Sequence, residues 1–201
     1  VYSFCMCPGG FVVNASSEEN HLVINGMSNH KRDEENANSA IVVQVSNKDF
    51  GNNIFDGMNF QRHLEEKAYN LGNGLIPVQL FSDYENNTIS KKFKSVKPIF
   101  KGNYKFANIN DIFPEFINND LKEAINYFNN KIDGFNSGDA IIAGVETRTS
   151  SPIRIVRGEN GMSNIDGIYP IGEGAGYSGG ITTSAMDGIK ISELIAKVYK
   201  N

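Results

Sequence analysis

Short apolar runs separated by Asn, Ser and Gly clusters dominate the first third of the chain. The runs Phe11–Val13, Leu22–Ile24 and Ala40–Val45 have the length and spacing that are typical of β-strands. The polar connection Asn14–Asn20 joins the first two runs and predicts a hairpin. Residues 25–39 form a long charged segment, which in a compact domain is either functional or flexible.

Helical periodicity follows in two middle segments. From Met58 to Leu71, apolar residues recur at helical spacing opposite charged residues, and Gly72 ends the pattern. A second helix is predicted from Pro114 to Lys131. Further strands are predicted at Ile76–Phe81, Asp139–Glu146 and Ile153–Val156.

The most informative stretch lies near the end of the chain. An apolar run, Ile168–Ile171, is predicted as a strand; Glu173 follows within the glycine-dense segment Gly172–Gly180. A helix is predicted over Ser184–Tyr199, with four apolar residues packing on that strand: Ile189, Leu194, Ile195 and Val198. The order of strand, carboxylate, glycine turn and helix brings backbone N–H groups and a positive helix terminus close to a ligand that carries oxygen atoms. A turn that only joins a strand to a helix is the alternative, and the six glycines between Gly167 and Gly180 make it the weaker one.

Arg148 lies in a run of hydroxyl side chains, Thr147–Pro152. Its guanidinium is suited to hold a carboxylate or a phosphate through a fork of N–H donors. An ordinary surface turn explains the run equally well, so both interpretations stay open.

Composition limits the range of functions. The chain has 201 residues, 40% of them hydrophobic, with a formal net charge of −4. It can bury a core, and it has no general attraction for nucleic acid. Residues 91–105 interleave lysines with aromatic residues, which permits base stacking, but the acidic total favours a solvated connection whose aromatic side chains face the core. No apolar run approaches the roughly 20 residues that span a bilayer, so we expect a cytoplasmic protein without membrane or nucleic-acid partners.

The cysteines predict neither a disulfide nor a metal site. Cys5 and Cys7 are too close in sequence for an easy disulfide, and His21, His30 and His63 show no paired metal-ligand spacing. We interpret the cysteines as two reduced thiols, with a redox or substrate-facing role as the alternative.

The C-terminal segment Gly167–Gly188 resembles the FAD-binding segment of flavoproteins with two dinucleotide-binding domains. Taken with Phe4–Gly10 and Glu146–Pro152, it is similar to a family of poorly characterised bacterial FAD-dependent dehydrogenases. The similarity covers essentially the whole chain. It implies an FAD-dependent oxidoreductase acting on a small molecule, without identifying a catalytic residue.

The resemblance also implies roles for individual residues. Glu173 would bind the ribityl or pyrophosphate region of FAD, and Gly179 and Gly180 would let backbone N–H groups approach the flavin ring. The cofactor-binding residues implied are Gly172, Glu173, Gly174, Gly179, Gly180 and Ile181. The implied substrate-binding residues are Arg148, Thr149 and Ser150.

The predicted fold class is α+β. Residues 1–8 would be a strand remnant of the FAD-binding domain, residues 9–145 a β-rich inserted substrate-side domain, and residues 146–201 the strand–helix end of a Rossmann-like FAD-binding domain. The Gly-x-Gly-x-x-Gly fingerprint that binds the ADP pyrophosphate is absent. Because the chain starts at Val1, in what reads as a strand, we expect the N-terminal half of the protein to be missing and FAD binding by this piece to be weak or nil. A cofactor-free module that binds a phosphate or an acidic ligand at the glycine turn is the alternative function.

Overall fold

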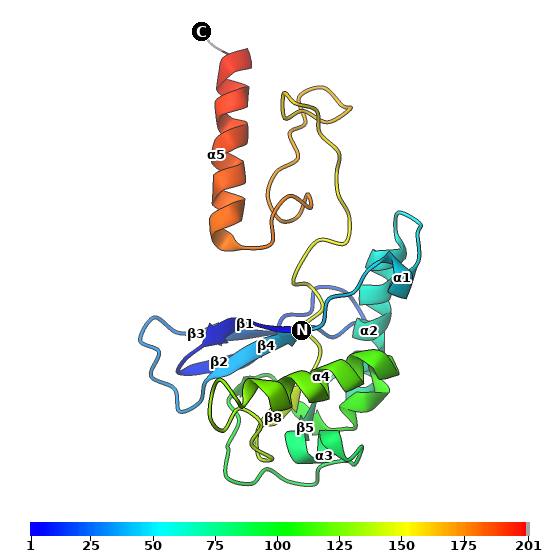
Figure 1. Ribbon diagram of the computed structural model, residues 1–201, viewed down its shortest axis with the longest axis vertical. Coiled ribbons are helices and arrows are strands. Elements are labelled where there is room, and N and C mark those ends of the chain that lie inside the picture. The colour runs from blue at the N-terminus through cyan, green and yellow to red at the C-terminus, as the bar shows by residue number, and fades with distance from the viewer. Residues whose placement is uncertain (200–201) are drawn as a thin grey trace. The chain divides into compact units, whose positions relative to one another are not determined.

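The computed structural model describes residues 1–199, and the chain divides into two compact units (Figure 1). Unit 1 comprises residues 1–45 and 61–147. Unit 2 comprises residues 46–60 and the chain from residue 148 onward, so it is discontinuous in sequence. The boundary after Phe60 falls inside helix α2 (Asp56–Gly72). The domain boundaries predicted after residues 8 and 145 concern the whole protein and stay predictions.

The predicted hairpin is present in unit 1. Strand β2 (Gly10–Asn14) pairs antiparallel with β3 (Ile24–Ser28), and the short β6 (Phe100–Lys101) lies parallel on the other side of β2. The second strand begins at Ile24 rather than at Leu22. The Leu22 N–H donates to the carbonyl of Glu65 in α2, which takes it away from a strand ladder.

Two further sheets lie in unit 1. Strand β1 (Tyr2–Cys7) pairs antiparallel with β4 (Asn38–Val42), with an irregularity between Phe4 and Cys7. Strand β5 (Ile76–Leu80) is the centre of the third sheet, parallel to β7 (Tyr104–Phe106) and antiparallel to β8 (Ile141–Ala143). Every side chain of β5 is buried, so this strand runs through the core of unit 1.

The two predicted middle helices are confirmed as α2 and α4 (Glu115–Phe128). Two shorter helical turns were not predicted, α3 (Phe81–Glu85) and η1 (Ile109–Asp111). The core residues that these elements share are Leu64, Ala68, Phe81, Tyr84, Ile109, Ile112, Leu121 and Ile125. The buried amide of Gln79 donates to the Thr88 carbonyl and accepts from the Ile109 N–H, and these hydrogen bonds offset the cost of removing it from water.

The lysine- and aromatic-rich segment packs its rings together. The Phe93 ring lies 5.2 Å from the ring of Tyr104 and 4.7 Å from that of Phe106, centroid to centroid. Lys94 pairs with Asp139, and the Nζ of Lys101 lies over the Phe11 ring. The rings pack on one another rather than in the core, since Tyr104 is 43% exposed and Phe93 and Phe106 are half-buried.

Unit 2 contains α1 (Asn47–Phe50), the first residues of α2, and α5 (Ile181–Val198). The strands predicted at Ile153–Val156 and Ile168–Ile171 are not formed, so those two predictions are wrong. Neither run has a strand neighbour within residues 1–199, and Ile168 and Ile171 are about half exposed. The structure is therefore mixed α and β with small sheets, and it does not show a Rossmann-like sheet in this part of the chain.

Helix α5 confirms the predicted C-terminal helix and begins three residues earlier, at Ile181. The face predicted to be packed was partly wrong. Ile191 is the buried residue, whereas Ile189 and Val198 are 63% and 58% exposed. Because no strand forms before it, α5 packs on a loop instead: a Cβ on Gly161 would lie 2.8 Å from Cδ1 of Ile191.

Within residues 1–199, no helix is both long enough and apolar enough to cross a membrane.

Candidate cofactor site

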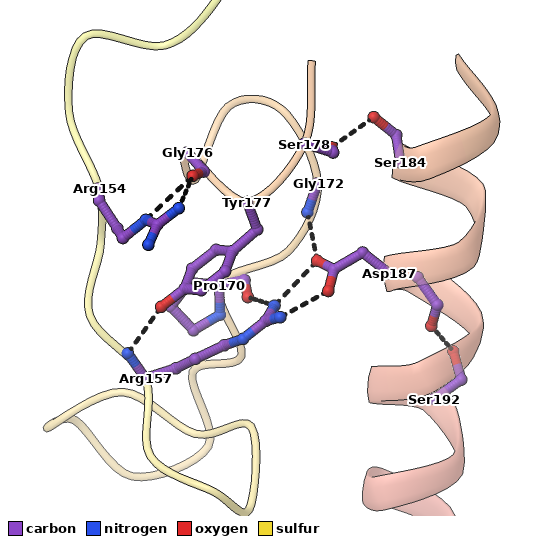
Figure 2. Close-up of polar contacts among 11 residues, drawn as sticks. Arg154, Arg157, Pro170, Gly172, Gly176, Tyr177, Ser178, Ser184, Asp187 and Ser192 are labelled. Carbon is purple, nitrogen blue, oxygen red and sulfur yellow. Dashed lines mark hydrogen bonds and ion pairs between the residues drawn. The ribbon is translucent and has the colours of Figure 1, made fainter. Parts of the chain in front are cut away.

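An ion pair between Arg157, which precedes the glycine-rich turn of unit 2, and Asp187 in α5 lies next to this turn (Figure 2). The guanidinium donates two hydrogen bonds to the carboxylate, at 2.5 and 2.9 Å. The same carboxylate accepts the Gly172 N–H at 2.9 Å, and Arg157 also donates to the Pro170 carbonyl at 2.7 Å. The side chains of Arg157 and Asp187 are only 9% and 11% exposed. One carboxylate therefore joins the helix, the turn and the segment before the turn.

The electrostatics of this pair follow from its geometry. Hydrogen bonds from the Arg157 side chain and the Gly172 backbone lower the pKa of Asp187 to about 2. The hydrogen bond to Asp187 raises the pKa of Arg157 above its usual value. Both groups are therefore charged throughout the physiological pH range.

Tyr177 completes the attachment from inside the turn. The Arg157 guanidinium carbon lies 3.6 Å from the centroid of the Tyr177 ring, and the Tyr177 hydroxyl accepts the Arg157 backbone N–H at 3.1 Å. Arg154 lies 4.8 Å from the same ring centroid and donates twice to the Gly176 carbonyl, at 2.9 and 3.0 Å. Cation–π contacts and charged hydrogen bonds thus hold the turn in place without a strand ladder.

Two glycines of the turn are required by the fold itself. Gly172 has φ 69° and Gly176 has φ 80°, in the left-handed region that glycine adopts without strain. A Cβ on Gly176 would lie 2.6 Å from the carbonyl oxygen of Ile153. Backbone hydrogen bonds from Gly176 to Glu173 and from Tyr177 to Gly172 close the turn.

Among residues 1–199, nothing requires glycine at three other positions of the segment, Gly174, Gly179 and Gly180. A Cβ on Gly174 would meet no atom within 4 Å, and one on Gly179 or Gly180 would meet only a hydroxyl oxygen at 3.7 Å, an ordinary contact. None of the three has a positive φ. Glycine loses more conformational entropy on folding than any other residue, so it lowers stability unless something requires it. No contact of the described residues explains why these three positions are glycine.

The N-terminus of α5 lies immediately after these glycines. Its N-cap, Gly180, provides no side-chain hydrogen bond to the first turn. Ser184 and Ser178 share a hydrogen bond of 2.7 Å, and Ile181 is 93% exposed. The first backbone N–H groups of an 18-residue helix are thus left without a capping side chain, which suits them to an oxygen atom from outside the chain.

The predicted substrate segment lies beside this turn. The Oγ of Ser150 is the atom 3.7 Å from the Cβ position of Gly179. Ser151 Oγ donates to the carbonyl of Ile153 at 2.8 Å and lies 3.3 Å from the carbonyl oxygen of Gly174. Arg148 is exposed and Thr149 is half-buried. The structure therefore places Ser150 close to Gly179, one of the predicted cofactor-binding residues.

Glu173 is half-buried at the start of the turn. Its backbone carbonyl accepts the Gly176 N–H, while its carboxylate has no hydrogen-bond or ion-pair partner among residues 1–199. The carboxylate is thus available to a ligand.

Sequence reasoning missed the residues that position this turn, Arg157, Tyr177 and Asp187. The helical periodicity contained a signal for one of them. Asp187 falls three residues after Ser184 and four before Ile191, so all three share the packed face of α5. A carboxylate at such a position requires a cationic partner.

Unit 1 holds the residues that precede the substrate segment. Thr147 donates to the buried carboxylate of Glu65 at 2.5 Å, and its carbonyl accepts from the side chain of Gln61 at 2.9 Å. Burial raises the pKa of the neighbouring Glu146. Gln61 and Glu65 lie one turn apart in α2, so two hydrogen bonds with the same helix face hold Thr147 in position.

The cysteines lie in β1 of unit 1. Cys5 is exposed with φ 49°, and Cys7 is half-buried, its Sγ donating to the Cys5 carbonyl at 3.4 Å. Among the residues that the structure describes, no three His, Cys, Asp or Glu side chains are grouped so as to hold a metal ion.

Comparison with known proteins identifies the family. The family described as "FAD-dependent protein, C-terminal domain-like" matches residues 1–149. An uncharacterized protein of Clostridium beijerinckii is 49% identical over 203 residues, which cover 99% of this chain and 38% of the relative. The chain is thus a C-terminal piece and spans well under half the length of that relative. The chain belongs to this family, the FAD-dependent protein, C-terminal domain-like family.

Proposed function

We propose that, in the whole protein, residues 172–181 form part of the FAD site of an oxidoreductase. Family membership supports a flavoprotein. The turn and the helix N-terminus offer backbone donors, a carboxylate and room for close approach, which are the groups that an oxygen-rich cofactor needs. FAD supplies the redox chemistry when it is bound, and the protein contributes position and electrostatics.

The proposal rests on the presence of three glycines that the fold itself does not require. Gly174, Gly179 and Gly180 have neither a strained backbone nor a crowded Cβ position. Glycine at such places is useful when a group outside the chain must approach the backbone closely. All three flank Glu173 or the N-terminus of α5, so the group that approaches them would also reach a carboxylate and free N–H donors.

Each part of the site has a distinct role in this proposal. Gly179 and Gly180 let the backbone contact the flavin, and the helix dipole that begins at Ile181 stabilises negative charge near it. Glu173 accepts hydrogen bonds from cofactor hydroxyls. Gly172 is a positioning residue here, since its N–H is already bound by Asp187.

The substrate segment has a role of its own. We propose that Arg148, with Thr149 and Ser150, orients an anionic substrate group, because a guanidinium recognises a carboxylate through two parallel hydrogen bonds. The position of Ser150 beside Gly179 supports this, since it puts one member of the segment next to the cofactor residues.

A cofactor-free module is the second candidate. The uncapped N-terminus of α5 suits a phosphate as well as a flavin, so the same geometry supports a module that binds an anion without redox chemistry. A visible flavin spectrum in the purified whole protein separates the two functions.

The test is flavin content in the whole protein and in its Glu173→Ala variant. A charged hydrogen bond contributes about 1.5–3 kcal/mol, so the variant is expected to bind FAD roughly 10- to 100-fold more weakly. Glu193→Ala, a carboxylate removed from the exposed side of α5, is the matched control and should keep its flavin. Equal flavin affinity in both variants removes Glu173 from the site. Whole protein that never contains flavin and binds inorganic phosphate instead supports the cofactor-free module.

A further inference from the structure

The two cysteines of the chain lie at an irregularity in strand β1 of unit 1. Between the paired positions Phe4 and Cys7, β1 advances three residues while its partner β4 advances only two, so β1 carries one extra residue. This insertion is a β-bulge, in which the bulged strand bends and its ladder is interrupted. Cys5 falls inside the bulge and Cys7 at its end, so a bond between their side chains would break no regular pairing of the strand.

The bulge brings Cys5 and Cys7 within reach of a disulfide. Alternate residues of a regular strand are about 6.6 Å apart, near the upper end of the roughly 4.4–6.8 Å that separates the Cα atoms of disulfide-bonded cysteines. Because the bulge fits three residues into the length of two, it shortens this separation. The Sγ of Cys7 donates to the Cys5 carbonyl at 3.4 Å, so this sulfur already lies next to Cys5.

Cys5 holds a backbone conformation that cysteine rarely adopts. Its φ of 49° lies in the left-handed region, which few residues other than glycine, asparagine and aspartate occupy. Such conformations persist where the surrounding structure enforces them, frequently at functional sites. The segment that follows Cys5 is held from two sides: Ser28 donates its hydroxyl to the Pro8 carbonyl at 2.8 Å, and the Gly10 N–H donates to the Asn36 carbonyl at 2.7 Å.

The two thiols have different surroundings. Cys5 is exposed, whereas Cys7 is half-buried. The Sγ of Cys7 lies 3.8 Å from the Cβ position of Gly26, so the backbone of β3 approaches this sulfur on a side where glycine leaves room for it. An exposed thiol can react with a molecule from solvent, and a neighbouring thiol held in place can then displace the product.

We propose that Cys5 and Cys7 form a redox-active dithiol that reduces low-molecular-weight disulfides. The Cys5 thiolate attacks one sulfur of the small disulfide, forms a mixed disulfide with it and releases the other half as a thiolate. The Cys7 thiolate then attacks the Cys5 sulfur, which closes the Cys5–Cys7 disulfide and releases the second half. The protons of the two cysteine thiols pass to the released thiolates, so two electrons move from the protein to the small disulfide. The proposal does not depend on flavin binding.

The short ring favours a reversible disulfide over a structural one. Only Met6 separates the two cysteines, so the ring is tight and its geometry strained. Strained or exposed disulfides are the more oxidising ones, which are labile or catalytic. A ring this small also removes little entropy from the unfolded chain, so it would stabilise the fold little. A disulfide at this place is therefore suited to a redox cycle.

The test is the reaction of the reduced whole protein with glutathione disulfide, a small disulfide that serves as the probe. The products are quenched in acid, alkylated with N-ethylmaleimide and identified by mass spectrometry on the tryptic peptide that ends at Lys31. This peptide contains both cysteines, because no Lys or Arg precedes Lys31 in the chain. We expect it to lose the mass of two hydrogen atoms and to take up no N-ethylmaleimide. The ratio of internal disulfide to glutathione adduct should be at least about tenfold higher in the folded protein than in denaturant, because the bulge holds the two thiols close together.

Single substitutions separate the two roles. Cys7→Ser should stop at the mixed disulfide, with one glutathione on Cys5. Cys5→Ser is the matched control: it keeps only the half-buried thiol and should form its adduct at least about tenfold more slowly. Equal rates in the two variants would overturn the assignment of Cys5 as the attacking thiol.

The wild-type products decide the proposal on their own. A peptide that stays fully alkylated overturns it, and so does a peptide that carries glutathione on both cysteines without closing the ring. A disulfide from Cys5 or Cys7 to a cysteine elsewhere in the protein also overturns it. Equal product ratios in the folded and denatured protein show that the fold does not prepare the pair. Glutathione disulfide, not FAD, accepts the electrons, so each of these results leaves the proposed FAD site standing.

Discussion

Asp187 in α5 binds Arg157, thirty residues earlier in the chain, through two hydrogen bonds from one guanidinium. Arg157 lies in a segment without regular secondary structure, so no sheet or helix fixes its distance from α5. The ion pair does so instead. It also holds Gly172, because the same carboxylate accepts the Gly172 N–H.

Replacing Asp187 by Asn should loosen the glycine turn locally. The neutral amide loses the charged hydrogen bonds to Arg157, which contribute about 1–3 kcal/mol. Amide hydrogen exchange at Gly172 and Tyr177 should therefore become roughly 5- to 150-fold faster. Glu193→Gln changes the same functional group on the exposed side of α5 and should leave these rates unchanged. Unaltered exchange in Asp187→Asn would show that the pair does not hold the turn.

The ion pair also predicts a pH dependence. The pKa of Asp187 is lowered in the folded state to about 2, from an ordinary value of 3.8, so folding stabilises its charged form. The resulting stability is complete above about pH 4 and is lost as the pH falls through about 2. Protection of the Gly172 amide, corrected for the intrinsic exchange rate, should be constant from pH 7 to 4 and decrease below. The Asp187→Asn variant should lack this decrease, and a parallel decrease in both proteins would assign it to another group.

Alanine substitutions should separate the structural glycines from those proposed to meet the cofactor. Gly176→Ala forces a Cβ against the Ile153 carbonyl at a positive φ and should destabilise unit 2 by more than about 1 kcal/mol. Gly174→Ala and Gly179→Ala should be neutral or stabilising by up to about 1 kcal/mol. In the whole protein, Gly174→Ala and Gly179→Ala should each lower the flavin content. Thermal unfolding and flavin absorbance measure the two effects, and full flavin occupancy in both variants would contradict the proposed contact.

The contact between Thr147 and Glu65 should be important for unit 1. Thr147→Val keeps the shape but removes the hydroxyl that donates to a buried carboxylate, which should destabilise unit 1 by about 1–3 kcal/mol. Thr147→Ser retains the donor and should restore most of this loss. Denaturant unfolding of the three proteins measures the difference. A valine variant as stable as the wild type would show that Glu65 is satisfied without Thr147.

Local sequence patterns predicted the elements whose stability is local. Apolar residues at helical spacing predicted helices α2, α4 and α5. Two apolar runs joined by a short polar connection predicted the hairpin of β2 and β3. The glycine turn was likewise recognisable from composition. In the helices and the hairpin, the backbone hydrogen bonds that define the element join residues close in sequence, whereas the glycine turn is held by the more distant Arg154 and Arg157.

The predictions that failed depended on distant partners. Ile153–Val156 and Ile168–Ile171 are apolar enough for strands, but a strand exists only beside another strand, and the described chain offers them none. The Arg157–Asp187 pair was missed for the same reason. A helical pattern places Asp187 on the packed face, yet it does not say which of the chain's cationic side chains reaches it.

The discontinuity of unit 2 has a consequence for its synthesis. Gly57 lies against Pro152, so residues 46–60 pack with a segment that the ribosome makes only after residues 61–147. At about 5–20 residues per second, this delay is on the order of ten seconds. During that time unit 2 cannot form, because its second segment has not yet been made. We therefore expect unit 1 to fold before unit 2.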